Sequence, residues 1–220
     1  MIKTKLSKTF FSLILLGLTL AVFFIYHKTI LMAAGDFLSP EGSENAEVVI
    51  LEGTELMREK SIEIAIDLLS SGETGRLVIV YHNSRNERIF ARHSYYDLFL
   101  IKALEDLGVK KDKIQVIEVP KDHPITLTEA QIVLSNLSKQ QVKSAILLAE
   151  GFHTRRSFWS YKQVGLPMGI KIIPHPYFTK YRNDNWWLCI DGIFDFVDEG
   201  MKFFYYLISG YIPIKSLVAT

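Results

Sequence analysis

Five short apolar segments alternate along this chain with segments whose apolar residues recur at helical spacing. The apolar segments lie at residues 47–51, 77–81, 114–119, 145–149 and 170–173. The helices expected between them lie at residues 56–70, 95–107, 126–139 and 154–163. Short runs rich in Val, Ile and Leu that alternate with amphipathic helices are typical of repeated βαβ units. The pattern therefore predicts an α/β fold with a doubly wound, mostly parallel five-stranded sheet of the Rossmann-like kind.

A second constraint comes from the N-terminal segment. From Thr9 to Tyr26 the chain has no charged residue, which is about the length needed to cross the hydrocarbon core as a helix. Secretory signal peptides have a shorter apolar region and a small-residue cleavage site. We therefore expect an uncleaved, single-pass helix in the bilayer. Lys3, Lys5 and Lys8 precede it and place the N-terminus in the cytoplasm.

This topology gives a domain organisation. Residues 1–34 are the cytoplasmic stub and transmembrane anchor, and residues 35–46 are a linker. Residues 47–220 are the α/β domain, which includes a C-terminal amphipathic helix. The expected location is the cytoplasmic membrane, with the domain facing the periplasm or the cell exterior.

Composition excludes some classes of function. The chain carries 25 Lys and Arg against 24 Asp and Glu. Because this balance leaves no broad basic field, we expect no nucleic-acid partner. Cys189 is the single cysteine of the sequence, so neither an intrachain disulfide nor a cysteine-based metal site is available.

The most informative polar cluster follows the fourth predicted strand. Glu150, His153, Arg155 and Arg156 lie between that strand and its helix, at the sheet edge where open α/β folds bind ligands. Cations in a first helical turn are disfavoured by about 0.3–1 kcal/mol each. A helix that begins with two arginines therefore indicates that an anion binds there, and the planar guanidinium suits phosphate or carboxylate.

Other strands add candidates at the same edge. Arg58 follows the first strand, Glu118 ends the third, and Thr126 and Glu129 begin the third helix. Together with the cluster after the fourth strand they form the predicted anion-binding set. The alternative is that they are ordinary solvated loop residues, since loops are polar by default.

Motifs for particular chemistries are missing from the sequence. There is no His-Glu-x-x-His spacing and no Gly-x-Ser-x-Gly nucleophile elbow. Gly53 alone is not a dinucleotide-binding fingerprint. We therefore expect no metal centre, and the sequence identifies no cofactor and leaves catalysis open.

Three stretches carry a resemblance to a known family. They are Glu47 to Gly53 with Arg58, then Thr126-Leu-Thr-Glu129-Ala130, and then Ile146 to Glu150 followed by Phe152-His153 and Arg155-Arg156. In this order they resemble the YdcF-like/SanA/ElyC family, a bacterial domain of unknown function often carried behind an N-terminal anchor. The chain has Glu52-Gly53-Thr54 where that family shows two or three glycines, and Tyr81-His82-Asn83 where it shows Ser-Gly-Gly.

The C-terminal segment at residues 190–212 has apolar residues near helical spacing, namely Ile193, Phe196, Val197, Phe204, Leu207 and Ile208. We expect a helix that packs on the sheet. The alternative is contact with the bilayer surface, where Trp and Tyr residues gather.

Two functions follow from these observations. The first is a membrane-anchored envelope protein that binds an anionic, phosphorylated or lipid-linked ligand, as enzyme or binding protein. The resemblance implies a role in cell-wall or surface-polysaccharide homeostasis. The alternative is a non-catalytic anchored module that binds a protein partner on a Rossmann-like scaffold.

Overall fold

The computed structural model describes residues 2–53, 59–83 and 93–218. Within these residues, five strands form one sheet in which every neighbouring pair is parallel. The strands are β1 (Ala46–Leu51), β2 (Thr74–Asn83), β3 (Ile114–Pro120), β4 (Ser144–Glu150) and β5 (Lys171–Tyr177), in the order β3-β2-β1-β4-β5. The prediction of a parallel, Rossmann-like α/β sheet with flanking helices is confirmed.

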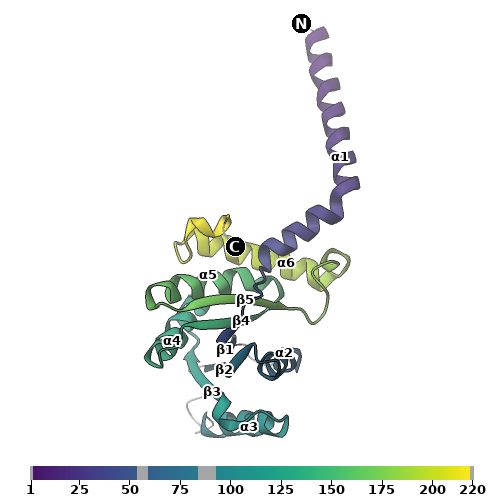
Figure 1. Ribbon diagram of the computed structural model, residues 1–220. Helices are drawn as coiled ribbons and strands as arrows, with labels where there is room; N and C mark the ends of the chain where they lie inside the picture. The colour runs from purple at the N-terminus through teal and green to yellow at the C-terminus, as the bar shows by residue number, and fades with distance from the viewer. Residues whose placement is uncertain (1, 54–58, 84–92, 219–220) are drawn as a thin grey trace.

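Both faces of the sheet are covered because its strands are apolar on both sides. In β1, Val48 and Ile50 belong to one buried cluster, and Val49 and Leu51 belong to the other. The helices α4 (Ile125–Lys139) and α5 (Thr154–Gly165) pack on the first face. The helices α2 (Glu59–Ser70) and α3 (His93–Asp106) lie on the second (Figure 1). This double cover explains the nearly continuous apolar strands.

The strand order fixes where a ligand site can form. The chain begins the sheet at β1, adds β2 and β3 on one side, and then crosses to β4 and β5 on the other. Neighbouring strands β1 and β4 therefore lead away in opposite directions at their carboxyl ends. Such a switch point opens a crevice in α/β sheets. Glu52 follows β1, and the short helix η3 (Gly151–His153) follows β4.

The N-terminal helix α1 (Ile2–Leu38) is bent and rises away from the domain (Figure 1). Among the described residues, no single helix is long and apolar enough to cross a membrane. One pair of segments, Leu13–Thr19 and Phe24–Leu38, passes the same length and composition test but is bent by 59°. The helix also continues through residues 35–38 of the predicted linker, where Leu38 is buried against the domain.

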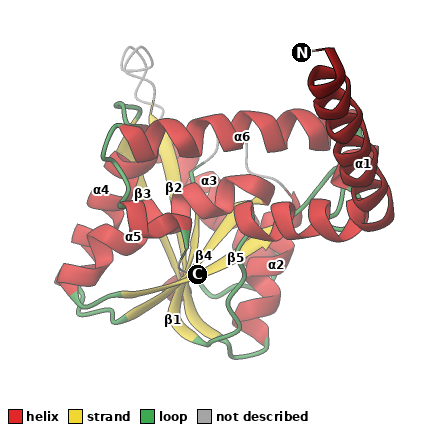
Figure 2. Cartoon of the chain, turned by 90° about the horizontal axis from the view of Figure 1, so that it is seen from above, coloured by secondary structure: helices red, strands yellow, loops and turns green. Residues whose placement is uncertain are grey.

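The C-terminal helix α6 (Ile190–Ile208) lies beside α5 and η3 (Figure 2). Its inward residues Phe203 and Tyr206 join the core on the α4–α5 side. Of the apolar residues that the sequence pattern directs to the sheet, Phe196 and Leu207 are partly buried against the core clusters. The others, Ile193, Val197, Phe204 and Ile208, are exposed. The helix therefore covers the loops at the carboxyl edge rather than presenting its apolar stripe to the sheet.

Candidate functional site

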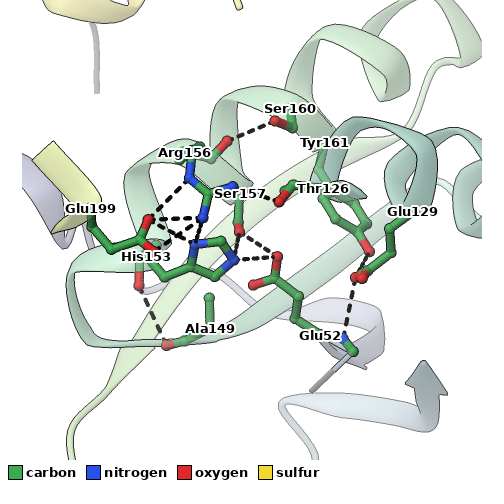
Figure 3. A network of polar contacts seen from close by, with 12 residues as sticks. Glu52, Thr126, Glu129, Ala149, His153, Arg156, Ser157, Ser160, Tyr161 and Glu199 are labelled. Carbon is green, nitrogen blue, oxygen red and sulfur yellow. Dashed lines mark hydrogen bonds and ion pairs between the residues drawn. The ribbon is translucent and has the colours of Figure 1, made fainter. Parts of the chain in front are cut away.

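The centre of the site is an imidazole held between two carboxylates. Nε2 of His153 lies 2.9 Å from Oε1 of Glu52, and Nδ1 lies 3.1 Å from Oε2 of Glu199 (Figure 3). Glu52 comes from the loop after β1, His153 from η3 and Glu199 from α6. Three segments far apart in the sequence thus meet at the β1–β4 switch point.

This arrangement favours the charged form of the imidazole. Burial and the nearby Arg156 lower the pKa of His153, but the carboxylates of Glu52 and Glu199 outweigh them and raise it to about 9. Burial would raise the pKa of Glu199, yet His153 and Arg156 hold it well below its usual range. The imidazolium form of His153 is therefore favoured at neutral pH, with Nε2 facing Glu52 and Nδ1 facing Glu199.

Arg156 is bound on the other side of Glu199. Its Nε lies 3.0 Å from Oε2 of Glu199, its Nη2 lies 3.1 Å from Oε1, and its Nη1 donates to Oγ1 of Thr126 at 2.7 Å. Nη2 also approaches Nδ1 of His153 to 2.7 Å, so two cationic groups share one carboxylate. The sequence indicated an anion at this helix start, and the structure places the chain's own Glu199 there.

Ser157 completes an arrangement that superficially resembles a hydrolytic triad. Its Oγ lies 2.9 Å from Nε2 of His153, and it also donates to Oε1 of Glu52. The side chain of Ser157 is, however, fully buried, and it lines neither of the two cavities described below. A nucleophile must reach its substrate, so we assign Ser157 to positioning Glu52 and His153.

A second pair of a histidine and a glutamate lies beside this network. Oε2 of the buried Glu129 is 2.5 Å from Nε2 of His82, and its Oε1 accepts from the Tyr161 hydroxyl at 2.7 Å. Burial raises the pKa of Glu129; the hydrogen bond with His82 opposes this rise, and repulsion from Glu52 adds to it. The protonated form of Glu129 is therefore favoured.

Gly53 is required by the closeness of this second pair. A Cβ atom at position 53 would lie 2.8 Å from Nε2 of His82 and 3.0 Å from Oε2 of Glu129. The amide of Gly53 also donates to Oε1 of Glu129 at 3.3 Å. Only a residue without a side chain lets the loop after β1 pass this close.

Two neighbouring cavities open at this edge, and Glu52, Gly53 and His153 line both of them. The first, called here the basic cavity, has a volume of about 350 Å³. Its polar lining consists of the shared residues with His82, His123, Thr126, Glu129, Arg156 and Lys202. The second, the acidic cavity, has a volume of about 260 Å³. Its charged and aromatic lining consists of the shared residues with Glu150, Phe152, Tyr177, Lys180, Tyr181, Asp195, Asp198 and Glu199.

Arg155 lies apart from this network. Its side chain is only 1% exposed, and it donates to the carbonyl oxygens of Phe37 and Ser216. Its guanidinium carbon lies 3.7 Å from the centre of the Phe37 ring. Burial lowers the pKa of Arg155 to about 10. Arg155 thus fastens the end of α1 and the short helix η6 (Ile214–Leu217) to α5.

The remaining predicted residues are dispersed. Glu150 lines the acidic cavity, where one of its oxygens accepts from Oγ1 of Thr179 at 2.8 Å. Glu118 is exposed on the edge strand β3 and lines neither cavity. Arg58 lies outside the described residues. The structure therefore brings together His153, Arg156, Thr126 and Glu129, with Glu150 in the adjoining cavity.

Glu199 is the main residue that sequence reasoning missed. The available signal was the spacing of Asp195, Asp198, Glu199 and Lys202, which repeats at intervals of three and four residues on one helix face. A charged face on a helix that also packs against the domain indicates a polar partner.

In the described part of the chain, no group of three or more His, Cys, Asp or Glu residues is placed to hold a metal ion.

Comparisons with known proteins add little. No family model matches the chain, and no curated protein matches it. One solved structure that it resembles is a protein from the universal stress protein family from Burkholderia pseudomallei. That match has a TM-score of 0.32 and 12% identity, and covers 60% of this chain and 96% of the other. We base no functional conclusion on this likeness.

Proposed function

We propose that this protein binds an anionic, phosphorylated ligand in the basic cavity while α1 holds it at the cytoplasmic membrane. The observation that carries the proposal is the charge of the cavity wall. His153, Arg156 and Lys202 are cationic, and His82 and His123 stand beside them. Glu52 and Glu129 are the acidic lining residues, and the pKa of Glu129 is raised. Counted over its lining residues alone, the cavity has an excess of positive charge, while Glu199 and Asp198 pair with Arg156 and Lys202 from outside this lining.

The lining residues contribute to phosphate binding in different ways. The donors of Arg156 are engaged by Glu199 and Thr126, so Arg156 contributes its field more than direct contacts. Lys202 is 47% exposed and is held by Asp198 at 2.6 Å and Glu199 at 3.1 Å. An exposed ammonium can turn from these carboxylates to a phosphate at little cost, because exposed ion pairs are weak. Lys202 and His123 are therefore the expected direct contacts.

The membrane part of the proposal is supported by apolar residues on the surface. Exposed apolar side chains on α6 are Ile190, Ile193, Phe194, Val197, Met201, Phe204 and Ile208. They recur at helical spacing, and α1 leaves the domain next to α6 (Figure 1). Both features fit α6 lying in the membrane interface with its apolar side in lipid. The lysines at the N-terminus favour the domain lying outside the cytoplasm.

In that setting the ligand would be a lipid-linked phosphate of cell-wall or surface-polymer assembly. The resemblance of the three stretches to the YdcF-like/SanA/ElyC family supports the envelope role. A phosphatase reporter that is active only outside the cytoplasm, fused after Thr220, tests the orientation. Activity of a cytoplasmic reporter in its place would contradict it.

Binding is tested with the full chain in nanodiscs, by calorimetric titration with inorganic phosphate and with a polyprenyl phosphate. We expect both to bind and Lys202→Ala to weaken them by about tenfold, since a charge-assisted hydrogen bond contributes about 1.5–3 kcal/mol. Lys171→Ala is the matched control. Lys171, at the start of β5, is about as exposed as Lys202 and is also paired with a carboxylate, that of Glu44. If neither phosphate binds, the anchored protein-interaction module becomes the better reading.

A further inference from the structure

The acidic cavity has no part in phosphate binding, yet it shares its wall with the basic cavity. It contains the carboxylates of Glu52, Glu150, Asp195, Asp198 and Glu199 against Lys180 and His153. Phosphate would be repelled there. The two cavities thus have opposite charge preferences on the two sides of the Glu52–His153 pair.

One buried oxygen in the wall that the two cavities share lacks a hydrogen-bond donor. The side chain of Glu52 is only 6% exposed, and its Oε1 is bound by His153 and Ser157. Its Oε2 is buried and has no hydrogen-bond partner among the described residues. Figure 3 shows this oxygen turned away from the Ser157–His153 contacts. A buried acceptor without a donor costs about 1–3 kcal/mol, so a ligand that donates to it is favoured.

The other residues that line the acidic cavity favour an organic cation as the group that donates to Glu52. Tyr181 lines the cavity and stacks on the buried Phe152 with ring centres 5.7 Å apart, and the buried Tyr177 lines it as well. Aromatic faces beside carboxylates attract ammonium groups. A bare metal ion fits less well, because it needs several oxygen ligands that converge within about 2.0–2.6 Å of one point. Within the described residues, no such group of His, Cys, Asp or Glu side chains is found.

We propose that the acidic cavity binds the ammonium group of a ligand whose phosphate occupies the basic cavity, so that the ligand is a phosphorylated amine. This inference rests on the proposed function. It assigns Glu52 two roles: Oε1 holds His153, and Oε2 accepts from the ammonium group. Asp195, which accepts from the Tyr181 hydroxyl at 3.0 Å, adds a further carboxylate to the same cavity.

The test compares three soluble probes on the full chain in phosphatidylglycerol nanodiscs: O-phosphoethanolamine, ethyl phosphate and 2-hydroxyethyl phosphate. In a merely cationic site, ethyl phosphate would bind best, because O-phosphoethanolamine carries less net negative charge. We expect the opposite order, with O-phosphoethanolamine binding at least about tenfold more tightly than either other probe. Asp195→Asn and Glu52→Gln should each reduce this ratio. Asp67→Asn, which removes an exposed carboxylate of α2 that lines neither cavity, should preserve it.

The outcomes separate the two proposals. If ethyl phosphate binds and the amine gives no advantage, or if the hydroxyl probe binds as well as the amine, the ammonium site is overturned and the phosphate site stands. If none of the three binds, both proposals fall. A further arm replaces the nanodisc lipid by phosphatidylethanolamine. If O-phosphoethanolamine binds more weakly in phosphatidylethanolamine nanodiscs, the lipid headgroup competes for the site and is the natural ligand. If its affinity is unchanged, the natural ligand is a free phosphorylated amine.

Discussion

Nε2 of His153 lies 2.9 Å from Oε1 of Glu52, although the two residues are 101 positions apart in the sequence. The contact joins the loops after β1 and β4, the paired strands at the switch point of the sheet. It also forms the wall that the basic and acidic cavities share. The charge of the His153 imidazole therefore affects both the stability of the domain and the two cavities.

The first prediction concerns stability and pH. The folded pKa of His153, about 9, exceeds its ordinary value of 6.5. The resulting stabilisation is fully present below pH 6.5 and is lost as the pH rises through about 9. We expect the free energy of unfolding of the detergent-solubilised chain to fall by about 1–3 kcal/mol across this window, because each pKa unit corresponds to about 1.4 kcal/mol. Thermal unfolding at a series of pH values measures this fall. His153→Gln should flatten the profile and His175→Gln should not. A wild-type profile already flat between pH 6.5 and 10 would refute the imidazolium.

The second prediction separates the adjacent arginines. Arg155→Leu leaves the carbonyl oxygens of Phe37 and Ser216 without these donors, at about 1–3 kcal/mol for each buried group. We expect a clear fall in unfolding temperature, with unchanged phosphate affinity in the molecules that remain folded. Arg156→Lys should instead weaken phosphate binding, because a lysine cannot reproduce the two-pronged contact with Glu199. Equal effects of both variants on phosphate affinity would contradict this separation.

The third prediction concerns α6 and lipid. In a Cys189→Ala background, a nitroxide attached at V197C should be reached by oxygen and shielded from a water-soluble relaxation agent. Val197 is exposed on the apolar side of α6, where the proposal places lipid. A nitroxide at E105C, on the exposed surface of α3, is the control and should show the reverse. If both positions report water, α6 does not lie in the interface.

The fourth prediction concerns Gly53. Gly53→Ala places a Cβ atom 2.8 Å from Nε2 of His82, so the loop or the His82–Glu129 pair must shift. We expect a destabilisation of about 1–3 kcal/mol, as for other overpacking changes, together with weaker phosphate binding. Gly17→Ala is the matched control, since nothing lies within 4 Å of its added Cβ atom. Unchanged stability and binding in Gly53→Ala would show that this loop adjusts freely.

The fold was predictable because it depends on short-range patterns. The continuous apolar run of β1 and the apolar spacing of α4 and α5 are visible in the sequence, and parallel pairing follows from the helices between strands. The site was predictable only in part. Position along the chain showed that His153 and Arg156 lie where α5 begins. It did not show that the adjacent Arg155 and Arg156 turn to different sides of that helix.

Long-range packing decided the rest of the site. Arg155 faces the end of α1, and Arg156 faces Glu199, because α1 and α6 pack on different parts of α5. No local pattern relates those helices to α5. The same holds for Glu52, which follows β1, and His82, which lies near the end of β2: both meet their partners only after the sheet is assembled.

The most direct test of the central claim is a histidine NMR titration of the full chain in nanodiscs with inorganic phosphate. The account predicts saturable shifts of the His123 and His82 imidazole resonances, which line the basic cavity, and none for His175, which lines a separate cavity with Glu41 and Glu73. In Lys202→Ala, saturation should need about ten times more phosphate. Uniform small shifts of all three histidines, or none at any concentration, would contradict a phosphate site at the carboxyl edge of the sheet.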